Sequence, residues 1–285
     1  MAMMNTILKS YNALGDDFYY HHTRSAPSGT QYSSGPESHR QYEILYLIDG
    51  SISYIIEGET YKVSAGDIIL VSPNEIHTLK IKENTSYERA VILFSLEIIE
   101  GLLEDGKKYR LFENERKMPR VINKESAQRY GLGEQIMSIV ESEDDEPYKR
   151  LHSISKLIEF IISLDKVLKK PIPNIKAPYT KDALIARVIE LIDENIRRPI
   201  SLDALAGELF VSKSTLCHRF SSYMHITPGR YITTKKMQLA QRLLQDGMGA
   251  QEVCRELGYD NYTTFYYNYK QIIGSSPALT EKKES

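Results

Sequence analysis

Features of secreted and membrane proteins are scarce in this sequence. It holds two cysteines, Cys217 and Cys254, which are too few for a disulfide framework or a cysteine-rich zinc site. No apolar run approaches the roughly 18 residues needed to cross a membrane. Residues 1–12 also lack the apolar core and the cleavage site of a signal peptide. We therefore expect a soluble cytoplasmic protein with no membrane partner.

Acidic residues are missing from one long segment. Residues 211–245 contain no Asp or Glu, although they carry six Lys or Arg residues and two His. The whole chain has a formal net charge of -2, so this basic surplus is local. A surface that faces the phosphates of duplex DNA should lack carboxylates and carry Lys and Arg. The alternative is a solvated basic face that binds nothing, which is the usual origin of a short charge run.

The length of 285 residues predicts two domains, because one domain usually takes about 100–200 residues. Between residues 15 and 97, short apolar runs such as YEILYLI and GDIILVS are separated by turn signals, which predicts a β-sandwich or a small β-barrel. Pro171, Pro173 and Pro178 then lie close together and block helix continuation. These features predict a first domain over residues 1–168, a proline-rich linker over 169–180 and an all-helical domain over 181–285.

A long helix is predicted over residues 148–168 at the end of the first domain. Its apolar residues recur at steps of three and four, namely Leu151, Ile154, Leu157, Ile158, Ile161, Ile162, Leu164 and Leu168. The broad apolar stripe fits two arrangements. The helix can pack on its own barrel, or it can form the seam of a homodimer.

The C-terminal region contains one two-helix unit twice. In the first copy, SLDALAGELF predicts a short helix, and Ser212 can cap a second helix, KSTLCHRFSSYM, whose exposed face is polar and cationic. In the second copy, Gly258 suits a helix end and Asn261 can cap YTTFYYNYKQII. Each copy predicts a helix-turn-helix whose second helix reads a DNA major groove. The connecting helix between them spans ~25 Å, which could place the two reading helices about one DNA turn apart.

Residues 181–280 resemble the DNA-binding domain of AraC/XylS-type transcriptional regulators. The resemblance rests on SLDALA, VSKSTLCHRF, TPGRYI, KMQLAQRLL, GYDNYTTF and SSP. It implies DNA contacts by Lys213, Ser214, Thr215, Cys217, His218 and Arg219 in the first reading helix and by Tyr262, Thr263, Tyr266 and Tyr267 in the second. Lys235 and Lys236 fit phosphate contacts. His218 and Tyr267 replace an arginine common in the family, and neither can bind guanine in the bidentate manner of arginine.

Two motifs in the β region resemble those of a cupin barrel, which AraC-type regulators commonly carry as a sensor. His39, Glu43 and Gly50 follow the first motif, and Gly66 and His77 follow the second. Metal-binding cupins hold one ion at such positions, which here would be Glu37, His39, Glu43 and His77. The same region could instead bind an organic ligand through His39, Glu43, Tyr54 and His77, or the histidines could be structural. Further hydroxyls near this region come from Tyr20, Tyr42 and Tyr46.

The fold class expected is therefore α+β and multidomain, with a cupin-like barrel, a helical dimerisation segment and two helix-turn-helix units. The leading functional hypothesis is a sequence-specific DNA-binding transcriptional regulator, more often an activator in this family. A sugar or related metabolite would bind in the barrel, and DNA and RNA polymerase would be its macromolecular partners. No cofactor is expected. The alternatives are a metal-dependent cupin enzyme fused to a DNA-binding domain, and a constitutive DNA-binding protein whose barrel only dimerises.

Overall fold

The computed structural model describes residues 5–12, 17–26, 32–95, 98, 119–169, 178 and 180–281. The chain divides into two compact units, Met1–Thr180 and Lys181–Ser285. Most of the predicted linker 169–180 lies outside the described residues. Within the described part of the chain, no helix combines the length and the apolar character needed to cross a membrane.

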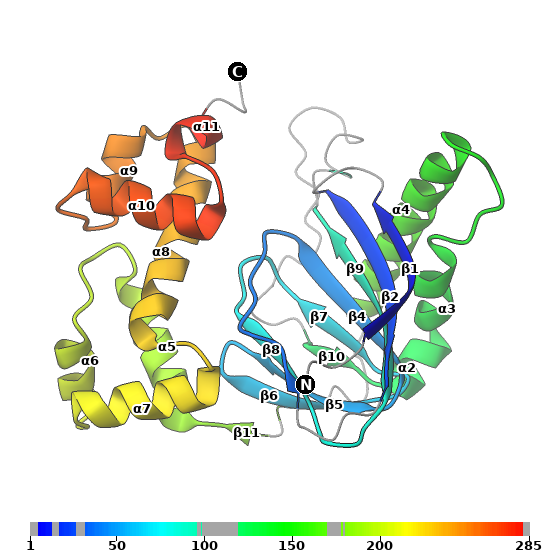
Figure 1. The fold of residues 1–285 in the computed structure, drawn as a ribbon, viewed down its shortest axis with the longest axis horizontal. Coiled ribbons are helices and arrows are strands. Elements are labelled where there is room, and N and C mark those ends of the chain that lie inside the picture. Colours follow the sequence, from blue (N-terminus) through cyan, green and yellow to red (C-terminus); the bar gives the residue numbers. More distant parts are fainter. Residues whose placement is uncertain are drawn as a thin grey trace. The chain divides into compact units, whose positions relative to one another are not determined.

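The first unit contains two β-sheets (Figure 1). The six-stranded sheet has the order β1-β2-β9-β4-β7-β10, and the second sheet includes β6-β5-β8-β3. The strands are β1 (Asn5–Asn12), β2 (Phe18–Ser25), β3 (Tyr32–Ser33), β4 (Tyr42–Asp49), β5 (Ser51–Ile56), β6 (Glu59–Ser64), β7 (Ile68–Val71), β8 (His77–Ile81), β9 (Tyr87–Phe94) and β10 (Val121–Ile122). The two-residue strand β11 (Thr180–Lys181) follows at the junction of the units in the chain.

The two faces of the six-stranded sheet bury two separate cores. On β4, Leu45 and Leu47 point between the two sheets, and Ile44 points to the opposite face, because successive strand residues alternate. That opposite face is covered by the helices α2 (Lys124–Arg129), α3 (Leu132–Ser138) and α4 (Tyr148–Leu168) (Figure 1). The predicted combination of a cupin-like sheet domain with a helical segment is confirmed.

The long helix α4 packs on its own unit. Leu157, Ile161 and Leu164 from the predicted apolar stripe are fully buried in the core beneath the helices. Leu151 and Ile162 from the same stripe are instead 61% and 36% exposed. The stripe is therefore divided, with most of it covering the sheet and a narrow outer line left at the surface.

From residue 183 onward, all regular secondary-structure elements among the described residues of the second unit are helices. Its helices are α5 (Ala183–Asn195), α6 (Leu202–Glu208), α7 (Lys213–Met224), α8 (Pro228–Gln245), α9 (Ala250–Glu256), α10 (Tyr262–Ile273) and α11 (Pro277–Glu281). The side chains of Ser212 and Asn261 accept hydrogen bonds from the first turns of α7 and α10, as predicted for helix caps. The two predicted helix-turn-helix units are therefore α6–α7 and α9–α10, and α8 connects them.

Candidate functional site

The first reading helix, α7, has one buried and one exposed face. Leu216 and Phe220 are fully buried at i, i+4 spacing. Ser214 and His218 are exposed on the other side, and Cys217 is half-buried. Because the outward side chains are short or flat hydrogen-bonding groups, this face is suited to contact base edges in a major groove.

The second reading helix, α10, is built in the same way. Phe265 and Tyr269 are fully buried, which matches their expected role in the core. Tyr262 is 39% exposed and Tyr267 is 65% exposed, whereas Tyr266 is half-buried. Thr263 and Lys213 are exposed at the first turns of α10 and α7. In Figure 1 the two reading helices lie at opposite ends of α8.

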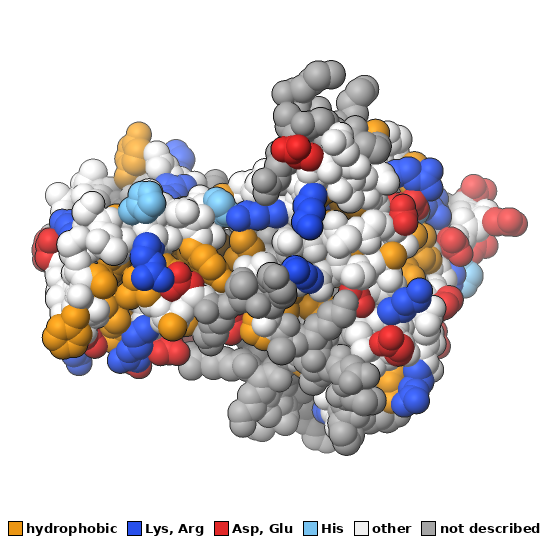
Figure 2. Space-filling model, turned by 90° about the horizontal axis from the view of Figure 1, so that it is seen from below, with side chains coloured by type: hydrophobic (Ala, Val, Ile, Leu, Met, Phe, Trp, Pro, Cys, Tyr) orange, Lys and Arg blue, Asp and Glu red, His pale blue; other side chains and the backbone are white. Residues whose placement is uncertain are grey.

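Acidic residues from other elements approach the acid-free segment. The guanidinium group of Arg219 donates hydrogen bonds of 2.7 and 2.9 Å to the two carboxylate oxygens of Asp182. Nζ of Lys213 likewise lies 2.9 Å from Oδ2 of Asp203. On the face shown in Figure 2, Lys and Arg side chains likewise lie among Asp and Glu side chains. The local absence of acids in the sequence therefore does not leave every cation of the segment unpaired.

The phosphate contact expected for Lys236 is wrong. Lys236 is only 5% exposed, and its ammonium group donates hydrogen bonds to the carbonyl oxygens of Arg198 at 2.8 Å and Leu257 at 2.6 Å. Burial lowers the pKa of Lys236. Lys235, its neighbour, is half-buried, with Nζ 5.6 Å from the centre of the Tyr231 ring. The ammonium group of Lys236 thus lies in the interior of the unit, whereas Lys235 is only half-buried.

The position of Lys236 marks the contact between the two helix-turn-helix units. Arg198 precedes α6, and Leu257 ends α9, so one ammonium group joins both copies. Next to it, Gly258 adopts a φ of +70°, and a Cβ there would lie 2.8 Å from Cδ of Pro199. Glycine is required here because of both the backbone angle and the close approach. This contact sets how the two reading helices are placed relative to each other.

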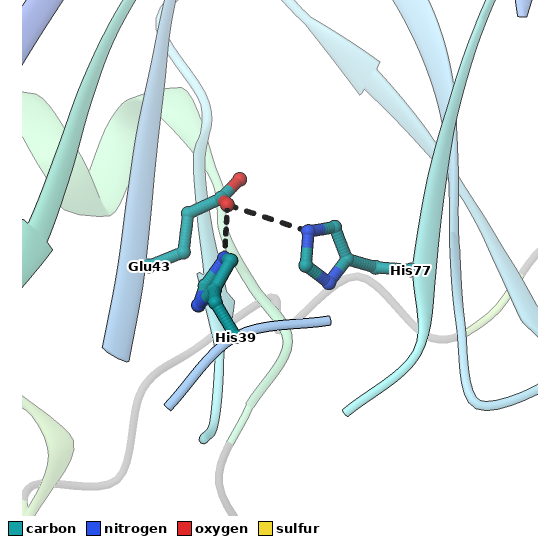
Figure 3. Close-up of side chains that lie close together, drawn as sticks. All are labelled: His39, Glu43 and His77. Atoms are coloured by element: carbon teal, nitrogen blue, oxygen red, sulfur yellow. Dashed lines mark hydrogen bonds and ion pairs between the residues drawn. The ribbon is translucent and has the colours of Figure 1, made fainter. Parts of the chain in front are cut away.

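A second polar site lies in the sheet unit (Figure 3). Oε2 of Glu43 is 2.9 Å from Nε2 of His39 and 3.4 Å from Nε2 of His77. Oε1 of Glu43 accepts a hydrogen bond of 2.6 Å from the Tyr54 hydroxyl. The Tyr54 ring also stacks on His77, with centroids 5.8 Å apart. The structure therefore brings together all four side chains that the sequence predicted for a ligand site.

Burial and charge act in opposite directions at this site. Burial favours the neutral form of Glu43, but the charges and hydrogen bonds of His77 and His39 outweigh it, so the pKa of Glu43 lies well below its ordinary value. Burial lowers and Glu43 raises the pKa of His77, and the net shift is upward. Burial, followed by Glu43, raises the pKa of Tyr54. The cluster therefore holds an ionised carboxylate next to a neutral phenol.

Other expectations for this region need correction. Glu37 is exposed, its backbone pairs with His77, and its carboxylate is not among the donor atoms that cluster with those of His39 and Glu43. Tyr20 and Tyr42 belong to the core beneath the helices, and Tyr46 packs against that core, so none of the three lines the space between the sheets. The physical reason is the alternation of strand side chains, which directs odd-numbered residues of β4 inward and even-numbered ones outward.

Sequence reasoning missed a second group of inward side chains. On β2 and β9, the cross-strand partners Thr23 and Arg89 lie on the inner face, with His21 and Tyr87 at neighbouring positions. The buried atoms His21 Nδ1, Thr23 Oγ1, Tyr87 Oη and Arg89 Nε have no hydrogen-bond partner among the described residues. Burial, followed by the charge of Arg89, lowers the pKa of His21 to about 4. The alternation of polar residues along FYYHHTRS was the signal that could have identified them.

Two family models match this chain. Residues 19–159 match an AraC-like ligand binding domain. Residues 205–283 match a helix-turn-helix domain. The first match begins within β2 and includes β3 to β10 and the polar clusters, and the second includes both reading helices.

Similar proteins align with this chain over most of its length. The HTH-type transcriptional regulator YfiF of Bacillus subtilis is 25% identical over 92% of this chain and 82% of its own length. The XylDLEGF operon transcriptional activator of Pseudomonas putida is 21% identical over 84% and 74%. The Msm operon regulatory protein of Streptococcus mutans is 23% identical over 97% and 98%. Among solved structures, ToxT of Vibrio cholerae O395 aligns over 94% of this chain and 99% of its own, at 15% identity and a TM-score of 0.37.

Proposed function

The chain belongs to the AraC/XylS family of transcriptional regulators, and on this premise we propose that it is a transcriptional activator whose sensor unit binds a small polar metabolite. One observation carries the DNA part of the proposal: two reading helices expose polar faces at opposite ends of α8 (Figure 1). With its 18 residues, α8 is about 27 Å long, which is comparable with one turn of DNA, ~34 Å.

The residues of each reading helix take separate roles in this proposal. Ser214, Cys217 and His218 of α7 contact base edges. Tyr262, Thr263, Tyr266 and Tyr267 of α10 contact bases, thymine methyl groups or phosphates. Lys235 contacts a phosphate, and Lys213, Thr215 and Arg219 lie beside the bases. Arg219 must first separate from Asp182, because one guanidinium nitrogen of Arg219 contacts both carboxylate oxygens of Asp182 in this structure.

The effector is proposed to bind between the two sheets. His39, Glu43, Tyr54 and His77 offer charged and hydrogen-bonding groups there, and His21, Thr23, Tyr87 and Arg89 add buried polar atoms with no partner among the described residues. Unpaired buried polar atoms cost free energy, which a ligand with several hydroxyl or carboxylate oxygens would recover. A sugar or a related metabolite has this chemistry. The unit would thus sense its ligand rather than transform it.

Dimer formation is proposed through the outer line of α4. Tyr148, Leu151 and Ile162 are 68%, 61% and 36% exposed, although each is apolar or aromatic. Residues 148, 151 and 162 lie on one side of a helix, so they can meet the same side of a second copy. Leu151→Lys should shift sedimentation of the full chain from dimer toward monomer, whereas Glu83→Lys, at an exposed turn position, should not. A wild-type chain that sediments as a monomer at all concentrations would refute the seam.

The central experiment is selection of binding sites from random duplex DNA by the full-length chain, followed by footprinting. We expect two protected blocks for each protomer, about 10–10.5 base pairs apart. Binding that depends on salt but has no sequence preference would refute the regulator. A thermal-shift screen against sugars and small metabolites then identifies the effector, because a ligand of the folded state raises the melting temperature. Genes next to the selected sites, which are transcribed in the cytoplasm by RNA polymerase, indicate the metabolite class to test first.

A further inference from the structure

The outward face of the second reading helix, α10, is aromatic and uncharged. Thr263 and Tyr267, four residues apart, form its outermost line, since Thr263 is exposed and Tyr267 is 65% exposed. Tyr262 and Tyr266 form a second line closer to the core, since Tyr262 is 39% exposed and Tyr266 is half-buried. No charged residue occurs in α10 before Lys270 in its last turn. The face that meets DNA in the proposed function therefore consists of phenol rings and threonine side chains.

The amide side chains next to these rings already have partners inside the unit. The side-chain oxygen of Asn261 accepts a hydrogen bond of 2.7 Å from the backbone N–H of Thr263. Asn268 is half-buried, and its side chain hydrogen-bonds with the hydroxyl of Tyr259. In the major groove, guanine is read by arginine or lysine and adenine by an outward amide. Before Lys270, α10 has no residue of the first kind, and its one amide, Asn268, is engaged with Tyr259.

The second line of rings is held in place by the core. Phe265 is fully buried, and the Tyr262 ring lies against it with centroids 5.8 Å apart. The centroids of the Tyr262 and Tyr266 rings are 6.4 Å apart. Aromatic pairs at such distances attract one another, and a tyrosine ring is ordered at a low cost in conformational entropy. The rings therefore form a preorganised apolar surface on the same face of α10 as Tyr267.

Only one base offers an apolar group to such a surface. In the major groove, thymine presents a C5 methyl group, whereas the edges of guanine, cytosine and adenine present hydrogen-bond donors and acceptors. Contact between a methyl group and a phenol ring removes apolar surface from water, which is favourable. A guanine or cytosine edge against the same ring would lose its hydrogen bonds to water without replacement. The methyl group of threonine also suits thymine.

We propose that Tyr267 and Thr263 read thymine methyl groups, so that the half-site under α10 is rich in A·T pairs. The rings of Tyr262 and Tyr266 extend this apolar surface along the groove. Base recognition by hydrogen bonds is then concentrated in the half-site under α7, where His218 is exposed. This mode of recognition rests on the proposed function, because it takes α10 to lie in a major groove.

The test uses the full-length chain and the binding sites that it selects from random duplex DNA. The block whose base preference changes in His218→Ala is assigned to α7, and the other block to α10. Each thymine of the α10 block is then replaced singly by deoxyuridine, which lacks the methyl group and keeps the hydrogen-bonding edge of thymine. Fluorescence anisotropy measures the affinity of the wild type and of the Tyr267 variants for each duplex.

We expect deoxyuridine to weaken wild-type binding about fourfold at one or more positions of the α10 block, the factor that corresponds to one buried methyl group. Tyr267→Ala should bind the thymine and deoxyuridine sites equally. The matched control is Tyr267→Phe, which keeps the ring and removes only the hydroxyl, and it should discriminate as the wild type does. Circular dichroism checks the fold of both variants, and the exposed position of Tyr267 leaves the core of the unit intact.

Three results overturn thymine recognition by α10. They are equal wild-type affinity for thymine and deoxyuridine throughout the α10 block, discrimination that persists in Tyr267→Ala, and a selected α10 block rich in G·C pairs. Loss of discrimination in Tyr267→Phe also overturns it, because the contact would then belong to the hydroxyl. Two sequence-specific blocks without methyl dependence refute only this mode of recognition, whereas binding without any sequence preference refutes the proposed regulator as well.

Discussion

Replacement of Lys236 by methionine tests whether the ammonium group of this residue stabilises the interior of the second unit. Methionine keeps the length and most of the volume of the side chain but removes the ammonium group. The carbonyl oxygens of Arg198 and Leu257 then lose their donor in a site where the residue is 5% exposed. The variant therefore leaves the exposed surface of the second unit almost unchanged while it breaks the link between α6–α7 and α9–α10.

The size of the effect follows from two lost hydrogen bonds. A hydrogen bond to a charged group contributes about 1.5–3 kcal/mol, so two at the lower end give about 3 kcal/mol. The cost of burying the ammonium group opposes this gain, which is why the lower end applies. For a unit of roughly 100 residues, the melting temperature should fall by about 12 °C or more.

The assay compares Lys236→Met with Lys235→Met in urea unfolding and in DNA binding at several salt concentrations. Lys236→Met should lower the free energy of unfolding, while the salt dependence of the folded variant stays as in the wild type. Lys235→Met should change stability little and reduce the salt slope by about 0.9, as expected when one phosphate contact is lost. If Lys236→Met kept full stability and lowered the salt slope instead, the assignment of Lys236 to the interior would be wrong.

Three further predictions concern the reading surface. His218→Ala should change the preference at one base pair by about 1–3 kcal/mol and spare binding to random duplex, which competition with single-base operator variants measures. Asp182→Asn keeps an acceptor for the first turn of α5 but weakens the ion pair with Arg219. The affinity for random DNA should therefore rise, and the salt slope of that binding should steepen. Unchanged values would show that Arg219 stays away from the duplex. A thiol reagent should modify half-buried Cys217 faster than buried Cys254, and operator DNA should slow only the reaction at Cys217, as mass spectrometry of the labelled peptides would reveal.

Local signals were sufficient for most of the architecture. A helix cap needs only a short polar side chain just before the backbone N–H groups from which it accepts hydrogen bonds, and the roles predicted for Ser212 and Asn261 are confirmed. The i, i+4 spacing likewise predicted the buried face of α7 through Leu216 and Phe220. The spacing from His39 to Glu43 was also enough to predict a shared site, because His39 lies just before β4 and Glu43 lies at the start of that strand.

The sequence by itself determined that a β region precedes the helical regions, and it determined the two reading helices and their inward faces, because these depend on interactions between residues a few positions apart. Only the tertiary structure decided which Lys and Arg side chains are buried or paired. The acceptors that satisfy Lys236 and Arg219 come from residues 21 to 38 positions away in the chain, and no local pattern records such partners. The same holds for Thr23 and Arg89, whose inward positions depend on the pairing of β2 with β9. Burial and charge pairing are properties of the assembled chain, so a run of basic residues indicates a surface only after folding has shown which of them remain on it.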